Sequence, residues 1–216
     1  MEARIPRSVR HEAPDPAEAV AEYQRCASCD IADRDQNRRR LRYPCPVCGV
    51  PGAGGLSHFP SGALALAELM RDHAAGAALG VVLPFCALGE VLLQHFLLGR
   101  MEQMGLPEAV RARLLDDHPT VKARQDRLFL TLTGETWKAA VKRLEEASRE
   151  DFNGPLTFWR KAADARDWYL FRGFAWSLSP EMPAQCREHL PGLLALFAAL
   201  HNEFVFVAPP PGDPEE

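Results

Sequence analysis

Apolar residues recur every three or four positions along most of the chain after residue 62, which is the spacing of helices that bury one face. Proline, glycine and Thr-Gly breaks divide this region into segments. The helices expected from this pattern span 63–75, 81–104, 107–117, 120–132, 133–150, 155–176 and 184–207. We therefore expect a mainly α chain with a bundle of about five to seven helices.

The first two helices define the expected core. The first is expected to bury one face made of Leu64, Leu66, Leu69 and Met70. The second is apolar nearly all round and is expected at the centre of the bundle. Its longest apolar run nearly has the length of a membrane span, but it is interrupted by Pro84, Glu90, Gln94 and His95. Because charge is costly inside a bilayer, a buried core helix is favoured and no membrane is expected.

Composition divides the chain into five parts. Residues 1–20 are polar and proline-rich and are expected to form a flexible arm, and 21–50 hold four of the six cysteines. Residues 51–62 form a Gly/Pro linker ahead of the bundle at 63–207, and 208–216 form an acidic tail that is expected to be disordered. The net charge is −4 and the first residues lack the apolar run of a secretory signal, so we expect a cytoplasmic protein with no global attraction for nucleic acid.

The cysteines of the second part form two C-x-x-C pairs, Cys26 with Cys29 and Cys45 with Cys48, with fifteen residues between the pairs. Each pair places two sulfurs on one tight turn, and this spacing is typical of a zinc-ribbon-like module that holds one tetrahedral ion. Disulfides conflict with a reducing cytosol, and a thioredoxin-like centre needs a βαβ pattern that the sequence lacks. An iron–sulfur cluster uses the same ligands. We expect one structural Zn²⁺, because a closed four-cysteine site leaves no open position for a substrate.

The loop between the two pairs is rich in arginine. Arginines on a metal-held loop can bind phosphates, but three acids in the same loop favour a merely solvated segment. The candidate nucleic-acid-binding residues are Arg34, Arg38, Arg39, Arg40 and Arg42, and the acids are Asp30, Asp33 and Asp35. The other two cysteines, Cys86 and Cys186, lie in apolar helical surroundings and are expected to be buried packing.

The segment 155–176 places one cation on an apolar helical face. The stripe consists of Trp159, Ala163, Arg166, Leu170 and Phe174. A cation on such a face needs a partner, and Glu90 in the central helix is an acid with the same need. The two residues are therefore expected either to pair with each other or to be satisfied by backbone and water.

Residues of about 64–206 resemble the HEPN family, the higher-eukaryote and prokaryote nucleotide-binding helical domains. The resemblance rests on the segments CALGEVLLQHFLLGRM, LFLTLTGETWKAAV and ARDWYLFRG. It implies an up-down helical bundle, a homodimer and, in many members, RNA cleavage by an arginine, a following polar residue and a histidine. Arg166 and Asp167 match the first two, and Glu90 matches a polar residue from an early helix. The histidine is missing, because its permitted positions carry Phe171, Arg172 and Gly173.

The missing histidine decides the expected function. Metal-free RNA cleavage needs a titratable base, and neither Arg172 nor its neighbours can supply one near neutral pH. Neither His95 nor His201 is an obvious replacement for the missing histidine. We expect a non-catalytic RNA- or protein-binding module, and the alternative is a metal-independent endoribonuclease with an unorthodox site. The candidate residues of that site are Glu90, Arg166, Asp167 and Arg172.

Overall fold

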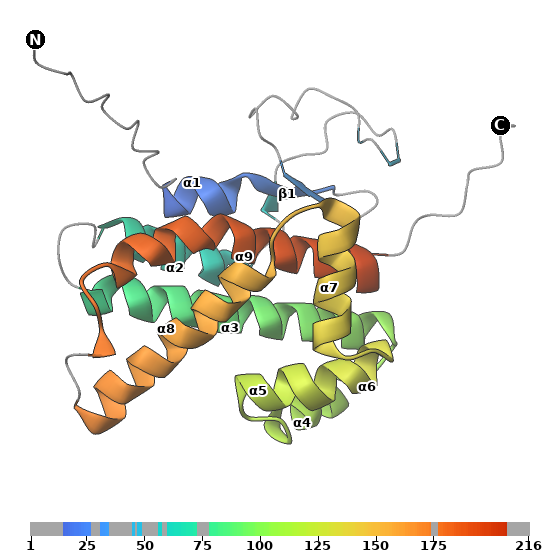
Figure 1. The fold of residues 1–216 in the computed structure, drawn as a ribbon. Helices are drawn as coiled ribbons and strands as arrows, with labels where there is room; N and C mark the ends of the chain where they lie inside the picture. The colour runs from blue at the N-terminus through green and yellow to red at the C-terminus, as the bar shows by residue number, and fades with distance from the viewer. Residues whose placement is uncertain are drawn as a thin grey trace, which may run out of the picture.

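The structure is a computed structural model that describes residues 15–26, 31–34, 45, 47–48, 56–57, 60–72, 78–173 and 177–206. It is mainly α-helical, as the apolar spacing predicted (Figure 1). The longer helices are α2 (Ser61–Asp72), α3 (Ala78–Gln103), α7 (Trp137–Ser148), α8 (Asn153–Arg172) and α9 (Met182–Phe204). The shorter ones are α1 (Pro16–Ala21), α4 (Glu108–Asp116), α5 (Val121–Ala123) and α6 (Phe129–Thr133), with a π-helical turn, η2 (Arg124–Leu128), between the last two.

Every segment expected to be helical after residue 62 contains helix, with ends displaced by a few residues. The segment 120–132 is the one that departs from a single regular helix, because the π-helical turn divides it into three short pieces. The Thr-Gly break is confirmed: Gly134 ends α6 with a φ of 79°, a left-handed conformation that favours glycine.

The region before the bundle is more ordered than its composition suggested. Asp15 caps α1 by accepting hydrogen bonds from the backbone N–H groups of Ala17 and Glu18, and Val20 is fully buried. The arm expected at 1–20 therefore does not continue through α1. Three short antiparallel strands follow in the order β2-β1-β3: β1 (Tyr23–Arg25), β2 (Ala32–Arg34) and β3 (Leu56–Ser57), the last inside the expected linker.

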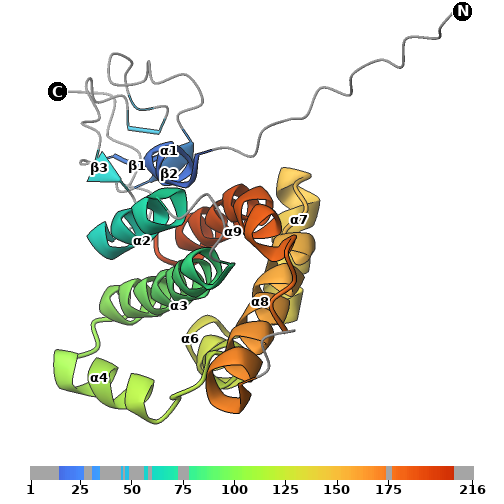
Figure 2. The same cartoon turned by 90° about the vertical axis from the view of Figure 1, so that its left-hand side faces the viewer.

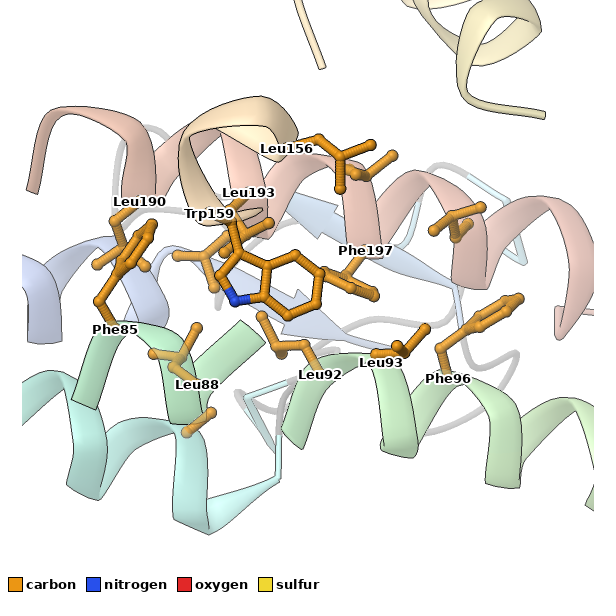
Figure 3. Close-up of a cluster of buried hydrophobic side chains, with 14 of the residues drawn as sticks. Phe85, Leu88, Leu92, Leu93, Phe96, Leu156, Trp159, Leu190, Leu193 and Phe197 are labelled. Carbon is orange, nitrogen blue, oxygen red and sulfur yellow. The ribbon is translucent and has the colours of Figure 1, made fainter. Parts of the chain in front are cut away.

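The core lies between α3, α8 and α9. α3 and α9 run alongside each other, and α8 crosses them (Figures 1 and 2). Figure 3 shows the indole of Trp159, from α8, inserted among leucine and phenylalanine side chains of α3 and α9. Its Nε1 donates a hydrogen bond to the backbone oxygen of Cys86 at 3.3 Å. A buried indole N–H is thereby satisfied inside an apolar cluster.

The central position expected for the apolar helix is confirmed for α3. By length and composition α3 could cross a membrane. An 18-residue stretch of it has a mean hydropathy of 1.8, and 61% of that stretch is buried inside the structure. The core helices of soluble proteins can have the same length and apolar composition, and α3 packs against α2, α8 and α9 as such a helix does.

The buried face of α2 differs from the expected one. Met70 is fully buried and Leu66 partly, but the exposed fractions of Leu64 and Leu69 are 36% and 46%. The buried stripe consists instead of Ala63, Ala67 and Met70. Two alanines one turn apart thus lie at the middle of the buried face, and Leu64 and Leu69 lie outside it.

Candidate metal centre and charged cleft

Three of the four predicted cysteine ligands lie together. The sulfurs of Cys26, Cys45 and Cys48 are all within 4.8 Å of one another, and the sulfurs of Cys26 and Cys48 are 3.7 Å apart. Sulfurs bound at about 2.3 Å to one tetrahedral ion stand about 3.8 Å apart, whereas a disulfide bond is about 2.05 Å long. The spacing therefore fits a metal site. Cys29 lies outside the described residues.

The surroundings of this site are apolar. Cys26 and Cys45 are buried, and Ile31 and Phe206 pack against them. Cys26 also donates its backbone N–H to the carbonyl of Ile31 at 3.0 Å, beside the last residue pair of β1 and β2. Clustered thiolates in such a setting need a soft cation to offset their charge, and zinc and iron are the usual ones.

The cysteine region is docked onto the bundle through α9. The side-chain amide of Asn202 accepts a hydrogen bond from the backbone N–H of Ala32 at 2.8 Å and donates one to the carbonyl of Ala32 at 2.7 Å. Tyr23 and Ala32 belong to the main hydrophobic core together with α2, α3 and α9. The cysteine cluster therefore lies next to the end of the last helix, where Phe206 packs against it.

The structure does not test the arginine loop. Arg34 is described only as a backbone position in β2, and Arg38, Arg39, Arg40 and Arg42 lie outside the described residues. Their role in nucleic-acid binding stays a prediction.

Glu90 and Arg166 form the ion pair that the sequence suggested. Nη1 of Arg166 donates to Oε1 of Glu90 at 2.7 Å, and its Nε donates to Oδ1 of Asp167 at 2.9 Å. The side chain of Arg166 is four-fifths buried, with an exposed fraction of 19%. Burial acts to lower the pKa of Arg166, but the hydrogen bonds to the two carboxylates outweigh it, and the pKa is raised. Arg166 is a permanent cation held between two acids.

Arg172 does not join this group. It lies at the end of α8, and its guanidinium carbon is 4.5 Å from the ring centroid of Trp168, which is a cation–π contact. Phe171 beside it is 80% exposed. The four candidate catalytic residues are therefore divided into a triad, Glu90, Arg166 and Asp167, and a separate Arg172.

The triad forms one wall of a cleft of about 630 Å³ between α8 and the segment α5–η2; we call it the charged cleft. Its carboxylates are Glu90, Asp126, Asp164 and Asp167. Its cations are Lys122, Arg160 and Arg166. Gln125 also lines it: the side-chain oxygen accepts a hydrogen bond from Arg160 at 2.9 Å, and its buried Nε2 has no partner among the described residues.

A second hollow of about 580 Å³ opens between α2, α3 and α8; we call it the apolar groove. Its lining includes Leu66, Leu69, Leu83, Pro84, Leu170 and Phe171. Arg166 and Asp167 line both the apolar groove and the charged cleft. The predicted stripe on α8 thus leaves the core gradually: Trp159 is fully buried, the side chain of Arg166 is about one-fifth exposed and Leu170 is about half exposed.

The two histidines considered as replacements for the missing one, His95 and His201, lie elsewhere. His95 and His201 line a different cleft of about 720 Å³, together with Glu102 and Arg111. Neither belongs to the set that lines the charged cleft. They do not supply the base that the triad lacks.

The two helical cysteines are packing residues, as expected. Cys86 and Cys186 are both fully buried. Burial raises the pKa of Cys86 to about 12 and raises the pKa of Cys186 in the same way. Their thiols are protonated and inert near neutral pH.

Comparisons with protein families, with curated proteins and with solved structures find no match to this chain. The HEPN resemblance therefore stays a prediction. Sequence reasoning missed Gln125, Arg160 and Asp164. One signal was present, because Arg160, Asp164 and Asp167 follow the i, i+4, i+7 spacing of a single helix face.

Proposed function

We propose that this protein is a zinc-binding, non-catalytic module that binds another protein through the surface of its HEPN-like helical bundle. The observation that carries the proposal is the state of Arg166, a cation already bound by two carboxylates in a cleft whose lining has more acids than bases. Such a cleft has little to offer an RNA backbone, whose binding depends on uncompensated Lys and Arg. A protein surface with both charged and apolar groups matches it better.

In this proposal the metal has a structural role. Cys29 completes the set of Cys26, Cys45 and Cys48, and four thiolates suit one structural Zn²⁺. When bound, the ion stabilises the cysteine region by offsetting the thiolate charge. The chain's own residues, Asn202 and Phe206, keep that region against α9.

No histidine belongs to the described residues that line the charged cleft, and this supports a non-catalytic role. Arg172 is stacked on Trp168, and its charge is permanent, so it is a poor proton acceptor. The ion pairs with Arg166 hold the carboxylates of Glu90 and Asp167 in place. We also propose self-association into a homodimer through Trp168 and Tyr169, which do not line the apolar groove, and a cytoplasmic location without a membrane.

The alternative, an endoribonuclease, is favoured by one observation: Glu90, Arg166 and Asp167 do converge in a cleft instead of being sealed in the core. A single-turnover assay on structured and unstructured RNA separates the two functions. We expect no cleavage by wild type or by Arg166→Ala, and cleavage that appears only in Arg172→His would support the non-catalytic proposal. Cleavage by the wild type that Arg166→Ala abolishes would overturn the non-catalytic proposal.

Metal analysis of the purified protein checks for one zinc per chain.

A further inference from the structure

The apolar groove and the charged cleft form one continuous surface. They are built on successive turns of α8, and they meet at Arg166 and Asp167, which line both. A ligand long enough to lie along α8 therefore meets an apolar half and an acidic half in a fixed order.

The apolar half exposes more than single surface leucines. Leu69, Leu170 and Phe171 are exposed by 46%, 47% and 80%, and they surround the groove from α2 and α8. Exposed apolar clusters of this kind, rimmed by polar residues, mark interaction sites. The volume of about 580 Å³ suits a few aliphatic side chains rather than a whole domain.

The charged half carries groups that lack partners. Asp126 and Asp164 make no ion pair or hydrogen bond among the described residues, and Nε2 of Gln125 is a buried donor without an acceptor. Gln125 lies in a π-helical turn, a distortion that is frequent at functional sites. A buried unpaired donor is costly, so its presence beside two free acids calls for a ligand that offers both a carbonyl and a cation.

We propose that this combined surface binds an amphipathic helix of a partner protein, with apolar side chains in the groove and a basic side chain reaching Asp126 and Asp164. The inference rests on the proposed protein-binding function and adds the chemistry of the partner. Charge complementarity decides it: the acids of the cleft outnumber its bases, and Arg166 is neutralised within the protein. Leucine-type residues at i, i+4 and i+7 followed by lysine reproduce this order on one helix face.

The test uses two labelled synthetic helices of about 18 residues, or five turns. Both carry leucines at i, i+4 and i+7; one has two lysines in the following turn and the other has two glutamates there. Binding to the zinc-loaded full chain is measured by fluorescence anisotropy at low and high salt. We expect the lysine peptide to bind at least about tenfold more tightly at low salt, with the difference shrinking as salt screens the acids.

Protein variants locate the site. Leu69→Gln is expected to weaken the lysine peptide about tenfold, because it places an amide in the groove. Leu130→Gln is the matched control, since Leu130 is similarly exposed, by 42%, on α6 outside both hollows, and it should bind like the wild type. Asp164→Lys should reverse the preference between the two peptides without affecting the leucine contacts. Circular dichroism confirms that each variant is folded.

The outcomes separate the partner's chemistry from the proposed function. Equal binding of both peptides that Leu69→Gln still weakens overturns the basic partner and leaves protein binding standing. A dimer in sedimentation velocity that Leu69→Gln dissociates shows that a second copy occupies the groove, which also overturns the inference. Binding of an RNA oligonucleotide, but of neither peptide, overturns both the inference and the protein-binding function.

Discussion

Gly89 leaves room on α3 for the side chain of Trp159 from α8. A Cβ at this position would overlap the indole ring of Trp159, the side chain at the centre of the core. The close approach also brings Nε1 of Trp159 within reach of the Cys86 carbonyl. The glycine therefore serves packing, because α3 is regular here and no positive φ is involved.

Gly89→Ala is expected to lower the free energy of unfolding by about 1–3 kcal/mol or more, since the indole must move out of its position. Urea denaturation followed by Trp fluorescence measures this change. The matched control is Gly62→Ala on α2, where a Cβ meets nothing within 4 Å and alanine should be neutral or stabilising by up to about 1 kcal/mol. Equal stability of Gly89→Ala and wild type would contradict the assigned contact.

Cys86 should make stability fall in alkaline solution. Its thiol ionises near pH 9.0 when exposed, but burial raises the pKa to about 12 in the folded chain, so the unfolded state loses the proton first. The contribution of Cys86 is complete below pH 9 and is lost as the pH rises towards 12, by about 1.4 kcal/mol per unit at most. Urea midpoints from pH 8 to 10.5, with reductant present, should decline less steeply in Cys86→Ala. Parallel slopes would show that Cys86 does not contribute.

At the scale of elements, the helices could be predicted and their contacts only partly. Apolar periodicity located each helix after residue 62, because a buried face leaves a mark in a single sequence. The buried face of α2 was misjudged, because the prediction followed the more apolar leucines, whereas the smaller Ala63 and Ala67 are the residues that are buried. The Glu90–Arg166 pair was predictable from two charges on apolar faces. The burial of Gln125 could not be predicted, because it depends on a π-helical turn for which the sequence gives no signal.

The link between α9 and β2 belongs to the same scale. Asn202 and Ala32 are 170 residues apart, and a side-chain amide that pairs with a distant peptide group leaves no periodic signal. Asn202→Ala should cost about 1–3 kcal/mol, because it removes two hydrogen bonds and leaves part-buried backbone groups unpaired. Chemical denaturation measures it, and Asn153→Ala at the exposed start of α8 is the control. An unchanged midpoint in Asn202→Ala would mean that the contact adds nothing to stability.

At the scale of the whole molecule, the cysteine region and the bundle share one core. The C-x-x-C spacing predicted correctly that Cys26, Cys45 and Cys48 lie together, in an arrangement that could hold a metal ion. The Gly/Pro composition of 51–62 suggested a separate module, but Tyr23 and Ala32 pack into the bundle core. Composition reports the local backbone only, and it carries no information about which surfaces dock.

Removing the metal should therefore affect the far end of α9 as well as the cysteine region. Without a bound cation the clustered thiolates repel or become protonated, so the support that they give to Phe206 and to the strand held by Asn202 is weakened. Hydrogen exchange should rise by about tenfold or more, which corresponds to about 1.4 kcal/mol, in β1, β2 and the last turn of α9.

The same change should leave the rest of the bundle helical. The contacts among α3, α8 and the start of α9 involve none of the cysteine ligands, so far-UV circular dichroism should decrease only slightly in Cys45→Ser or after chelation. Cys86→Ala is the control, because it removes a buried thiol outside the metal centre and should keep the exchange of β1 and β2 unchanged. Protection that persists in β2 and at the end of α9 after chelation would show that the bundle holds these segments by itself. Collapse of the helical signal throughout would show instead that the metal is required for the whole core.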